Sequence, residues 1–119
     1  MTRSAQLYGL QNCDSCRKAR RWLDGHDVGY RFRDIRADAP GRKKIAQWCG
    51  KTGWQTLLNR RSTSWRSLPD QRKQDLDSHR AIELMNDNPT LIRRPVLEFG
   101  DRLFVGFDAD AYAAEFLTR

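Results

Sequence analysis

Two cysteines separated by two residues, Cys13 and Cys16, are the side chains best suited to chemistry in this sequence. They stand where a short apolar run, 5–10, gives way to a helical pattern, and thiol–disulfide exchange uses this arrangement. Unpaired backbone N–H groups and the dipole at a helix start stabilise a negative charge, and Arg17 adds positive potential. We therefore expect the pKa of the Cys13 thiol to lie below its ordinary value of about 8.5, which makes Cys13 the predicted nucleophile.

Cys16 has two interpretations. As a resolving thiol it would attack a mixed disulfide on Cys13 and release the partner as a thiol. As a core residue it would pack on an apolar stripe and never form a disulfide, and Cys49 is predicted to be a core residue of this kind. No metal site is expected, because neither His26 nor His79 is spaced to complete a zinc site with the single Cys-x-x-Cys.

A second cluster, Arg93-Arg94-Pro95, precedes an apolar run late in the chain. In a thioredoxin-like fold a proline at this place is cis and faces the cysteine loop, so Pro95 is expected to be cis and to bring Arg94 to Cys13. A guanidinium there would stabilise the thiolate and bind an oxyanion or a carboxylate through two hydrogen bonds. The alternative for one arginine in a basic protein is exposure to solvent.

Apolar periodicity predicts the elements that position these residues. Residues 5–10 and 30–35 are expected to be strands on either side of a helix that Asn12 caps. The apolar face of that helix is predicted to hold Cys16, Ala19, Trp22, Leu23 and His26.

The middle of the chain is predicted to be helical and rich in loops. A buried stripe around Trp48 indicates one helix, a short apolar element follows at 54–58, and residues 71–86 indicate a further helix. The face of that further helix is predicted to hold Leu76, His79, Ile82, Glu83 and Met85.

The end of the chain carries the pattern of a hairpin followed by a helix. Residues 95–98 and 102–105 are expected to be the two strands, joined by 99–101. The last helix, capped by Asp108, is expected to turn Tyr112, Phe116 and Leu117 inward.

This order of elements predicts one α/β domain, and its length of 119 residues suits one hydrophobic core. The β-α-β start and β-β-α finish are the connectivity of a thioredoxin-like core, expected over 5–38 and 89–119. Residues 39–88 are expected to form an inserted helical segment. Because three cysteines with only one close pair suit a reducing compartment, the cytoplasm is the expected location.

The net charge of +7 comes from 22 Lys and Arg against 15 Asp and Glu, spread along the whole chain. Such a balance could attract nucleic acid, an acidic protein face or a small anion, but solvated helix faces give the same count. No direct nucleic-acid binding is expected, because no recognised binding motif accompanies the charge. No membrane association is expected either, because no apolar run approaches the roughly 18 residues that a spanning helix needs.

Several motifs resemble those of the Spx/YffB branch of the arsenate reductase (ArsC) family, and the likeness to YffB-type proteins is closest. The likeness covers nearly the whole chain and rests on residues 8–13, 16–23, 53–59, 63–66 and 92–95. It implies a thioredoxin-like core with an inserted helical segment and a reactive cysteine at Cys13.

The resemblance implies three activities. YffB-type proteins imply a glutathione-dependent thiol reductase that binds no cofactor, with glutathione as co-substrate or a glutaredoxin- or thioredoxin-type protein as reductant. Spx-type regulators imply a redox switch at the Cys-x-x-Cys and binding to the RNA polymerase α subunit. In arsenate reductases the cysteine attacks an oxyanion that three arginines cradle; Arg94 matches one of them, while the others fall at Asn59 and Val105.

We predict a thiol–disulfide or glutathione-dependent reductase. Cys13 attacks, Cys16 or glutathione resolves, and Arg94 with Arg61 orients an anionic group of the substrate. An Spx-like regulator and an arsenate reductase remain the alternatives. The other predicted substrate-binding residues are Asn12, Arg17, Asn59 and Pro95.

Overall fold

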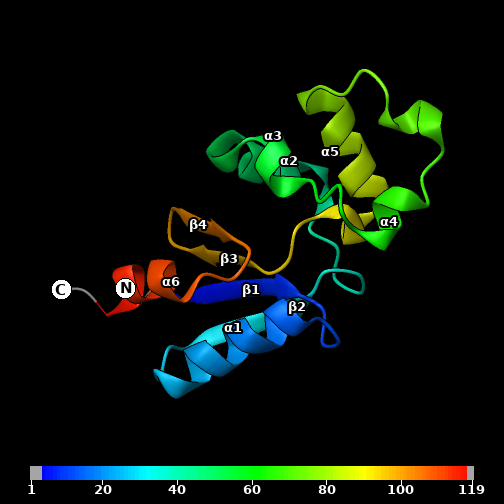
Figure 1. Ribbon diagram of the computed structural model, residues 1–119. Helices are drawn as coiled ribbons and strands as arrows, with labels where there is room; N and C mark the ends of the chain where they lie inside the picture. Colours follow the sequence, from blue (N-terminus) through cyan, green and yellow to red (C-terminus); the bar gives the residue numbers. More distant parts are fainter. Residues whose placement is uncertain (1–3, 118–119) are drawn as a thin grey trace. The chain divides into compact units, whose positions relative to one another are not determined.

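A computed structural model describes residues 4–117 of the chain (Figure 1). The chain divides into two compact units, one built from the chain up to Asp34 together with the chain from Arg94, and the other from Ile35–Arg93. These divisions fall near the limits of the inserted segment, 39–88, that the sequence predicts.

The first unit contains a four-stranded sheet in the order β2-β1-β3-β4. Strand β1 pairs in parallel with β2 and antiparallel with β3, and β3 pairs antiparallel with β4. Helix α1 connects the two parallel strands, and α6 follows the hairpin, so the predicted thioredoxin-like connectivity is confirmed. The elements are β1 (Ala5–Gly9), α1 (Asp14–Gly25), β2 (Tyr30–Asp34), β3 (Val96–Phe99), β4 (Arg102–Val105) and α6 (Ala109–Phe116).

The core of the first unit lies where α1 and α6 pack on the sheet. Ala19 and Leu23 of α1 and Tyr112 of α6 are fully buried with Leu7 and Leu97 of the two central strands. Partly buried aromatic side chains surround this cluster, which makes apolar burial the main stabilising contribution to the unit.

Helix α1 begins one residue later than the sequence predicts. The backbone N–H of Cys13 donates to the carbonyl of Leu10 at 3.3 Å, so Asn12 lies in a tight turn and Cys13 takes the N-cap position. At the other end, His26 lies beyond the helix and is exposed, stacked on Trp22 at 3.9 Å between ring centroids. The predictions of Asn12 as the cap and of His26 on the buried face are therefore wrong.

The second unit consists of short helical elements. They are α2 (Gly41–Thr52), α3 (Trp54–Leu57), α4 (Thr63–Arg66), the 3-10 turn η1 (Asp70–Lys73), α5 (Ser78–Asp87) and the 3-10 turn η2 (Pro89–Leu91). An isolated antiparallel bridge joins Leu58 to Ile92, next to the ends of α3 and η2. The fully or nearly fully buried side chains of this unit include Ile45, Trp48, Cys49, Leu57, Leu58, Ala81, Leu84, Met85, Leu91 and Ile92.

The helix predicted at 71–86 is broken in the structure. Asp75 has φ +53, a left-handed conformation that ends the preceding turn, and α5 starts only after Asp77, whose side chain accepts from the Arg80 N–H at 2.8 Å. The shifted start changes the buried face, so His79 is exposed. The residues of α5 that are buried are Ala81, Leu84 and Met85.

The end of the chain follows the prediction closely. Gly100, at φ 61, turns the hairpin, and Asp108 caps α6 by accepting from the N–H groups of Asp110 and Ala111 at 3.0 and 3.4 Å. Tyr112 is buried as expected. Leu117 is 52% exposed, against the prediction, because α6 ends one residue before it.

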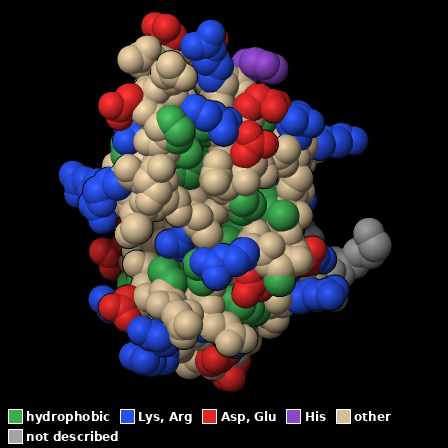
Figure 2. Space-filling view, turned by 90° about the vertical axis from the view of Figure 1, so that its right-hand side faces the viewer, with side chains coloured by type: hydrophobic (Ala, Val, Ile, Leu, Met, Phe, Trp, Pro, Cys, Tyr) green, Lys and Arg blue, Asp and Glu red, His purple; other side chains and the backbone are tan. Residues whose placement is uncertain are grey.

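None of the helices within residues 4–117 combines the length and the apolarity that crossing a membrane requires. On the face that Figure 2 shows, blue Lys and Arg side chains lie in small groups, with red acidic and tan uncharged side chains between them.

Candidate active site

Cys13 lies at the N-cap of α1, directly after the turn that follows β1. Its backbone is extended, with φ −103 and ψ 125, and its carbonyl accepts the first helical hydrogen bond from the Arg17 N–H at 2.9 Å. The Cys13 side chain makes no capping hydrogen bond as a thiol. A thiolate at this position faces the N–H groups of the first turn, where the helix dipole favours negative charge.

The surroundings of Cys13 favour its ionised form. Partial burial raises the pKa of the Cys13 thiol, but hydrogen bonds from the backbone and thiol of Cys16 and from the Arg94 guanidinium lower it. The positive charge of Arg94 adds to this effect, and the net result is a lowered pKa. The pKa of the Cys13 thiol therefore lies below its ordinary value, which is the direction that the sequence predicts.

Cys16 has the opposite character. Its side chain is fully buried, with 0% exposure. Burial raises the pKa of the Cys16 thiol to about 12; a hydrogen bond from the Leu10 backbone opposes this change, and the neighbouring Cys13 thiolate increases it. Near neutral pH, Cys16 is therefore a protonated thiol that donates to Cys13. Both thiols are free, and so is Cys49 in the second unit, where burial raises its pKa.

Gly9 provides the space that Cys16 occupies. A Cβ atom at Gly9 would lie 2.5 Å from the Cys16 Sγ, which is too close for any side chain without a shift of the thiol. Gly9 is not among the site residues predicted from the sequence. The only available signal was a glycine at the end of a buried strand, where it often marks the close approach of another group.

Arg94 reaches Cys13 because of the way β3 begins. Val96, the first residue of β3, pairs with Tyr8 near the C-terminal end of β1. The residues just before β3 therefore lie at the same edge of the sheet as Cys13, which follows β1. The Arg94–Pro95 peptide bond is cis, as the sequence predicts, and the Pro95 carbonyl accepts from the Gly106 N–H at 2.8 Å. These contacts fix the segment that carries the guanidinium.

The remaining predicted site residues are either exposed residues of the first unit or belong to the second unit. Asn12 is exposed in the turn before α1, and the exposed Arg17 pairs with Asp14. Asn59 and Arg61 belong to the second unit, where the Asn59 side chain accepts from the Arg61 N–H at 3.0 Å and so shapes the turn before α4. The structure thus brings Cys13, Cys16, Arg94 and Pro95 together within the first unit, and Asn59 and Arg61 together within the second.

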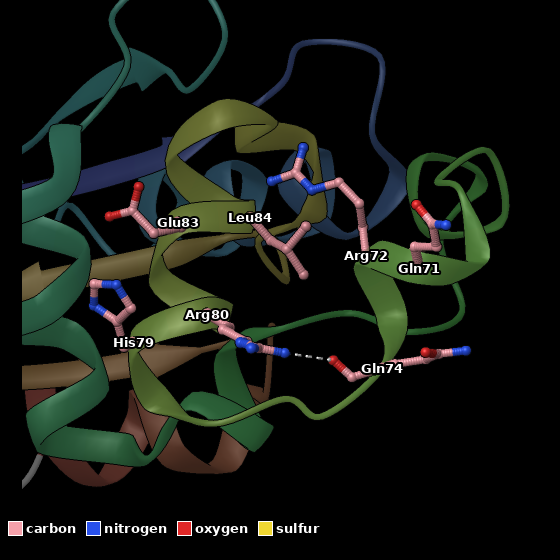
Figure 3. A pocket seen from close by; sticks show the side chains of 7 residues that line it. All are labelled: Gln71, Arg72, Gln74, His79, Arg80, Glu83 and Leu84. Atoms are coloured by element: carbon pink, nitrogen blue, oxygen red, sulfur yellow. Dashed lines mark hydrogen bonds between the residues drawn. The ribbon is translucent and has the colours of Figure 1, made fainter.

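A polar hollow of about 370 Å³ lies on the second unit between η1 and α5 (Figure 3). Its charged side chains already have partners: Arg72 pairs with Asp87 at 2.9 Å, Glu83 binds Arg42, and Arg80 donates to the Gln74 carbonyl. Because neither Cys13 nor Arg94 lines it, this hollow is not the candidate active site. Within residues 4–117, no group of His, Cys, Asp and Glu side chains has the arrangement of a metal site.

The chain is similar to several known sequences and solved structures. A YffB protein of known structure is 50% identical, with a TM-score of 0.91 over 93% of this chain and 97% of that protein. An arsenate reductase (ArsC) related protein from Brucella melitensis is 37% identical, with a TM-score of 0.74 over 95% of this chain and 94% of that protein. The global transcriptional regulator Spx of Listeria innocua is 36% identical over 109 residues, 87% of this chain and 80% of Spx.

The family model of the ArsC family matches residues 8–115, which include every residue of the site around Cys13. This match spans nearly the whole chain and agrees with the similarity to the YffB and Spx proteins. The chain therefore belongs to the ArsC family.

Proposed function

We propose that this protein is a glutathione-dependent thiol–disulfide reductase in which Cys13 is the nucleophile. The observation that carries the proposal is the opposite acidity of two neighbouring thiols, lowered pKa at Cys13 and raised pKa at Cys16, beside the Arg94 guanidinium. Such perturbed pairs are typical of catalytic sites. The three free thiols also suit the reducing cytoplasm, where glutathione is available.

The reaction begins when the Cys13 thiolate attacks one sulfur of a substrate disulfide. The S–S bond breaks, Cys13 is held in a mixed disulfide, and the other substrate sulfur leaves as a thiolate that takes up a proton. One glutathione thiolate then displaces the second substrate sulfur and remains bound to Cys13. A second glutathione attacks this adduct and restores the Cys13 thiolate. The substrate disulfide is thereby reduced to two thiols, and two glutathione molecules are oxidised to one glutathione disulfide.

Glutathione is favoured over Cys16 as the resolving thiol. Cys16 is fully buried against Gly9, and burial is the largest cause of its raised pKa, so its thiolate form is scarce near neutral pH. The half-buried Cys13 is open to a thiol from solution. Arg94 beside it attracts a negatively charged reductant, and glutathione carries two carboxylates. In this reaction Cys16 acts as a hydrogen-bond donor to Cys13.

The decisive experiment compares Cys13→Ser with Cys16→Ser in an assay of a small disulfide with glutathione. We expect Cys13→Ser to abolish formation of glutathione disulfide, and Cys16→Ser to keep most of the activity. Mass spectrometry of the wild-type protein after mixing with glutathione disulfide should show one glutathione adduct, on Cys13. Full activity in Cys13→Ser would overturn the mechanism.

The second candidate function is that of a redox-sensing transcriptional regulator, which the 36% identity to Spx and the Cys-x-x-Cys of this chain favour. In this case a Cys13–Cys16 disulfide would change the affinity for the RNA polymerase α subunit. The test is capture of purified α subunit by the reduced and the oxidised protein. A difference in capture between the two states would support this function, and no capture in either state would remove it.

A further inference from the structure

A hollow on the exposed side of α1 takes no part in the proposed chemistry. Its lining residues are Lys18, Arg21 and Trp22 of α1, with Phe107 and Ala109 at the start of α6, and its volume is about 380 Å³. We call this hollow the α1 flank. It belongs to the same unit as Cys13, and α1 is the helix that Cys13 caps.

The floor of the α1 flank is apolar and held in place from the core. Trp22 packs edge-on against Tyr112, with ring centroids 5.5 Å apart, and at a tilt against Phe116 at 6.3 Å. Phe107 contacts the same Tyr112 ring at 5.1 Å. Since Tyr112 is fully buried, these contacts hold the Trp22 and Phe107 rings in place. The part of Trp22 that the stacked His26 ring leaves uncovered forms, with Phe107, a preformed surface for an apolar group.

The rim of the α1 flank carries two cations that make no other polar contact. Lys18 and Arg21 are exposed, and neither has a hydrogen-bond or ion-pair partner among the residues that the structure describes, 4–117. The neighbouring Arg17, in contrast, is paired with Asp14. Binding an acidic group at Lys18 and Arg21 therefore breaks no existing ion pair of the protein.

We propose that the α1 flank docks an acidic segment of a disulfide-containing protein, with one apolar side chain on Trp22 and Phe107 and acidic side chains at Lys18 and Arg21. This rests on the proposed function, for which it specifies the substrate class. The hollow is open to solvent, whereas sites for small molecules enclose most of the ligand surface. A polypeptide suits an open hollow better, because its flanking residues cover the rim while one side chain fills the floor.

The rise of α1 also sets the smallest separation that the acidic residues of the substrate can have from its cysteine. At about 1.5 Å of rise per residue, Lys18 and Arg21 lie about 7.5 and about 12 Å beyond Cys13 along the helix axis. An extended peptide spans about 3.3 Å per residue. The acidic and apolar residues are thus expected roughly two to four positions from the cysteine that Cys13 attacks.

The test measures binding separately from turnover. The probe is a fluorescent peptide with a blocked cysteine and Glu-Phe-Glu starting two positions after it, titrated into the Cys13→Ser protein. A peptide with Lys-Phe-Lys is the control. We expect the acidic peptide to bind about tenfold more tightly, with an affinity that falls as salt is added. Equal affinity for the two peptides would overturn the docking site.

Charge-reversed variants locate the binding. Lys18→Glu combined with Arg21→Glu should weaken binding of the acidic peptide about tenfold. The control, Lys43→Glu combined with Arg66→Glu, changes the net charge equally at exposed positions of the second unit and should leave binding near the wild-type value. An equal loss in both double variants would mean attraction by net charge only and would overturn the proposal.

Turnover distinguishes failure of the docking site from failure of the reductase. In the wild-type protein with Cys13 present, the charge reversal at Lys18 and Arg21 should raise KM for a disulfide of the acidic peptide much more than KM for a small disulfide. An equal rise in KM for both substrates would overturn the docking site but leave the proposed reductase standing. Specific peptide binding in a protein that reduces neither disulfide would support the docking site and refute the proposed reductase.

Discussion

Cys13 and Cys16 are chemically identical side chains one helical turn apart, and their different acidity comes from their positions. Cys13 lies at the N-terminal end of α1, half-buried beside Arg94, whereas Cys16 packs against Gly9 with no exposed surface. The hydrogen bond between them links the two titrations, because a proton held by Cys16 stabilises negative charge on Cys13. Changes at Cys16 should therefore alter the reactivity of Cys13.

Replacing Cys16 by alanine should slow alkylation of Cys13 at pH 7. The variant loses one hydrogen bond to the thiolate, and a hydrogen bond to a charged group is worth enough to reduce the rate up to about tenfold. Cys16→Ser is the matched control, because its hydroxyl can still donate. The rate with iodoacetamide across pH measures both, and an unchanged rate in Cys16→Ala would contradict this role of Cys16.

Removing the Arg94 guanidinium should also raise the pKa of Cys13. Arg94→Ala is expected to slow alkylation at pH 7 several-fold, and Arg94→Lys to restore part of the rate because it keeps the charge. The control is Arg93→Ala, since the Arg93 Nε donates to the Thr56 carbonyl at 3.0 Å in the second unit. Equal effects of Arg93→Ala and Arg94→Ala would contradict the assignment.

Part of this site could be predicted from the sequence, because some of its contacts are local. The proposed nucleophile and its neighbour lie within one helical turn, so the spacing and the helix pattern were enough to single out Cys13 and Cys16 as candidates. Arg94 depends on β3 pairing with β1, a contact far along the chain, and it was found only through the expected fold. Gly9 was missed because its importance lies in the space it leaves for another side chain.

At the scale of elements, apolar spacing predicted the strands and α1 well, and local turn geometry caused the errors. Asn12 has the residue type of a cap, but the Leu10 to Cys13 turn moves the helix start past it. The helix predicted at 71–86 breaks at Asp75, whose left-handed backbone no periodic pattern indicates. The junction of β1 and α1 positions the Cys13 thiol. A substitution at this junction is therefore the most informative test at this scale.

Gly9→Ala should destabilise this junction. The new Cβ would lie 2.5 Å from the Cys16 Sγ, and such overpacking typically costs about 1–3 kcal/mol. Gly29→Ala is the control, because a Cβ there meets no atom within 4 Å. Urea unfolding measures both. Combining Gly9→Ala with Cys16→Ala should recover part of the lost free energy of unfolding. If the losses of the two single variants simply add in the double variant, the two positions are not in contact.

At the scale of the whole molecule, each of the two units has its own buried side chains, and the first unit carries two buried ionisable groups that stay neutral. Burial raises the pKa of Cys16 and of Tyr112, and the negative charge of an ionised Cys16 raises that of Tyr112 further. The Tyr112 hydroxyl has no hydrogen-bond partner within residues 4–117. Both groups therefore keep their protons in the folded protein at pH values at which the same groups of the unfolded chain ionise.

The free energy of unfolding should consequently decrease as pH rises. Ordinary Cys and Tyr side chains in the unfolded chain ionise near about 8.5 and about 10, so alkaline solution favours unfolding from about pH 8.5 upward. Cys13 acts in the opposite direction: its lowered pKa contributes stability that is present above about pH 8.5 and is lost as pH falls through its folded pKa. Urea unfolding between pH 7 and 11 should show this decrease, and a smaller one in Cys16→Ala. A flat profile would contradict it.

The unequal exposure of the three cysteines gives the protein a built-in attachment point. Cys16 and Cys49 are buried and have raised pKa values, whereas Cys13 is half-buried with a lowered one. A limiting amount of maleimide dye or nitroxide spin label should therefore react at one position of the native chain, with no cysteine removed. The labelled position is the sulfur of the proposed nucleophile, so the probe reports directly on any molecule that approaches it.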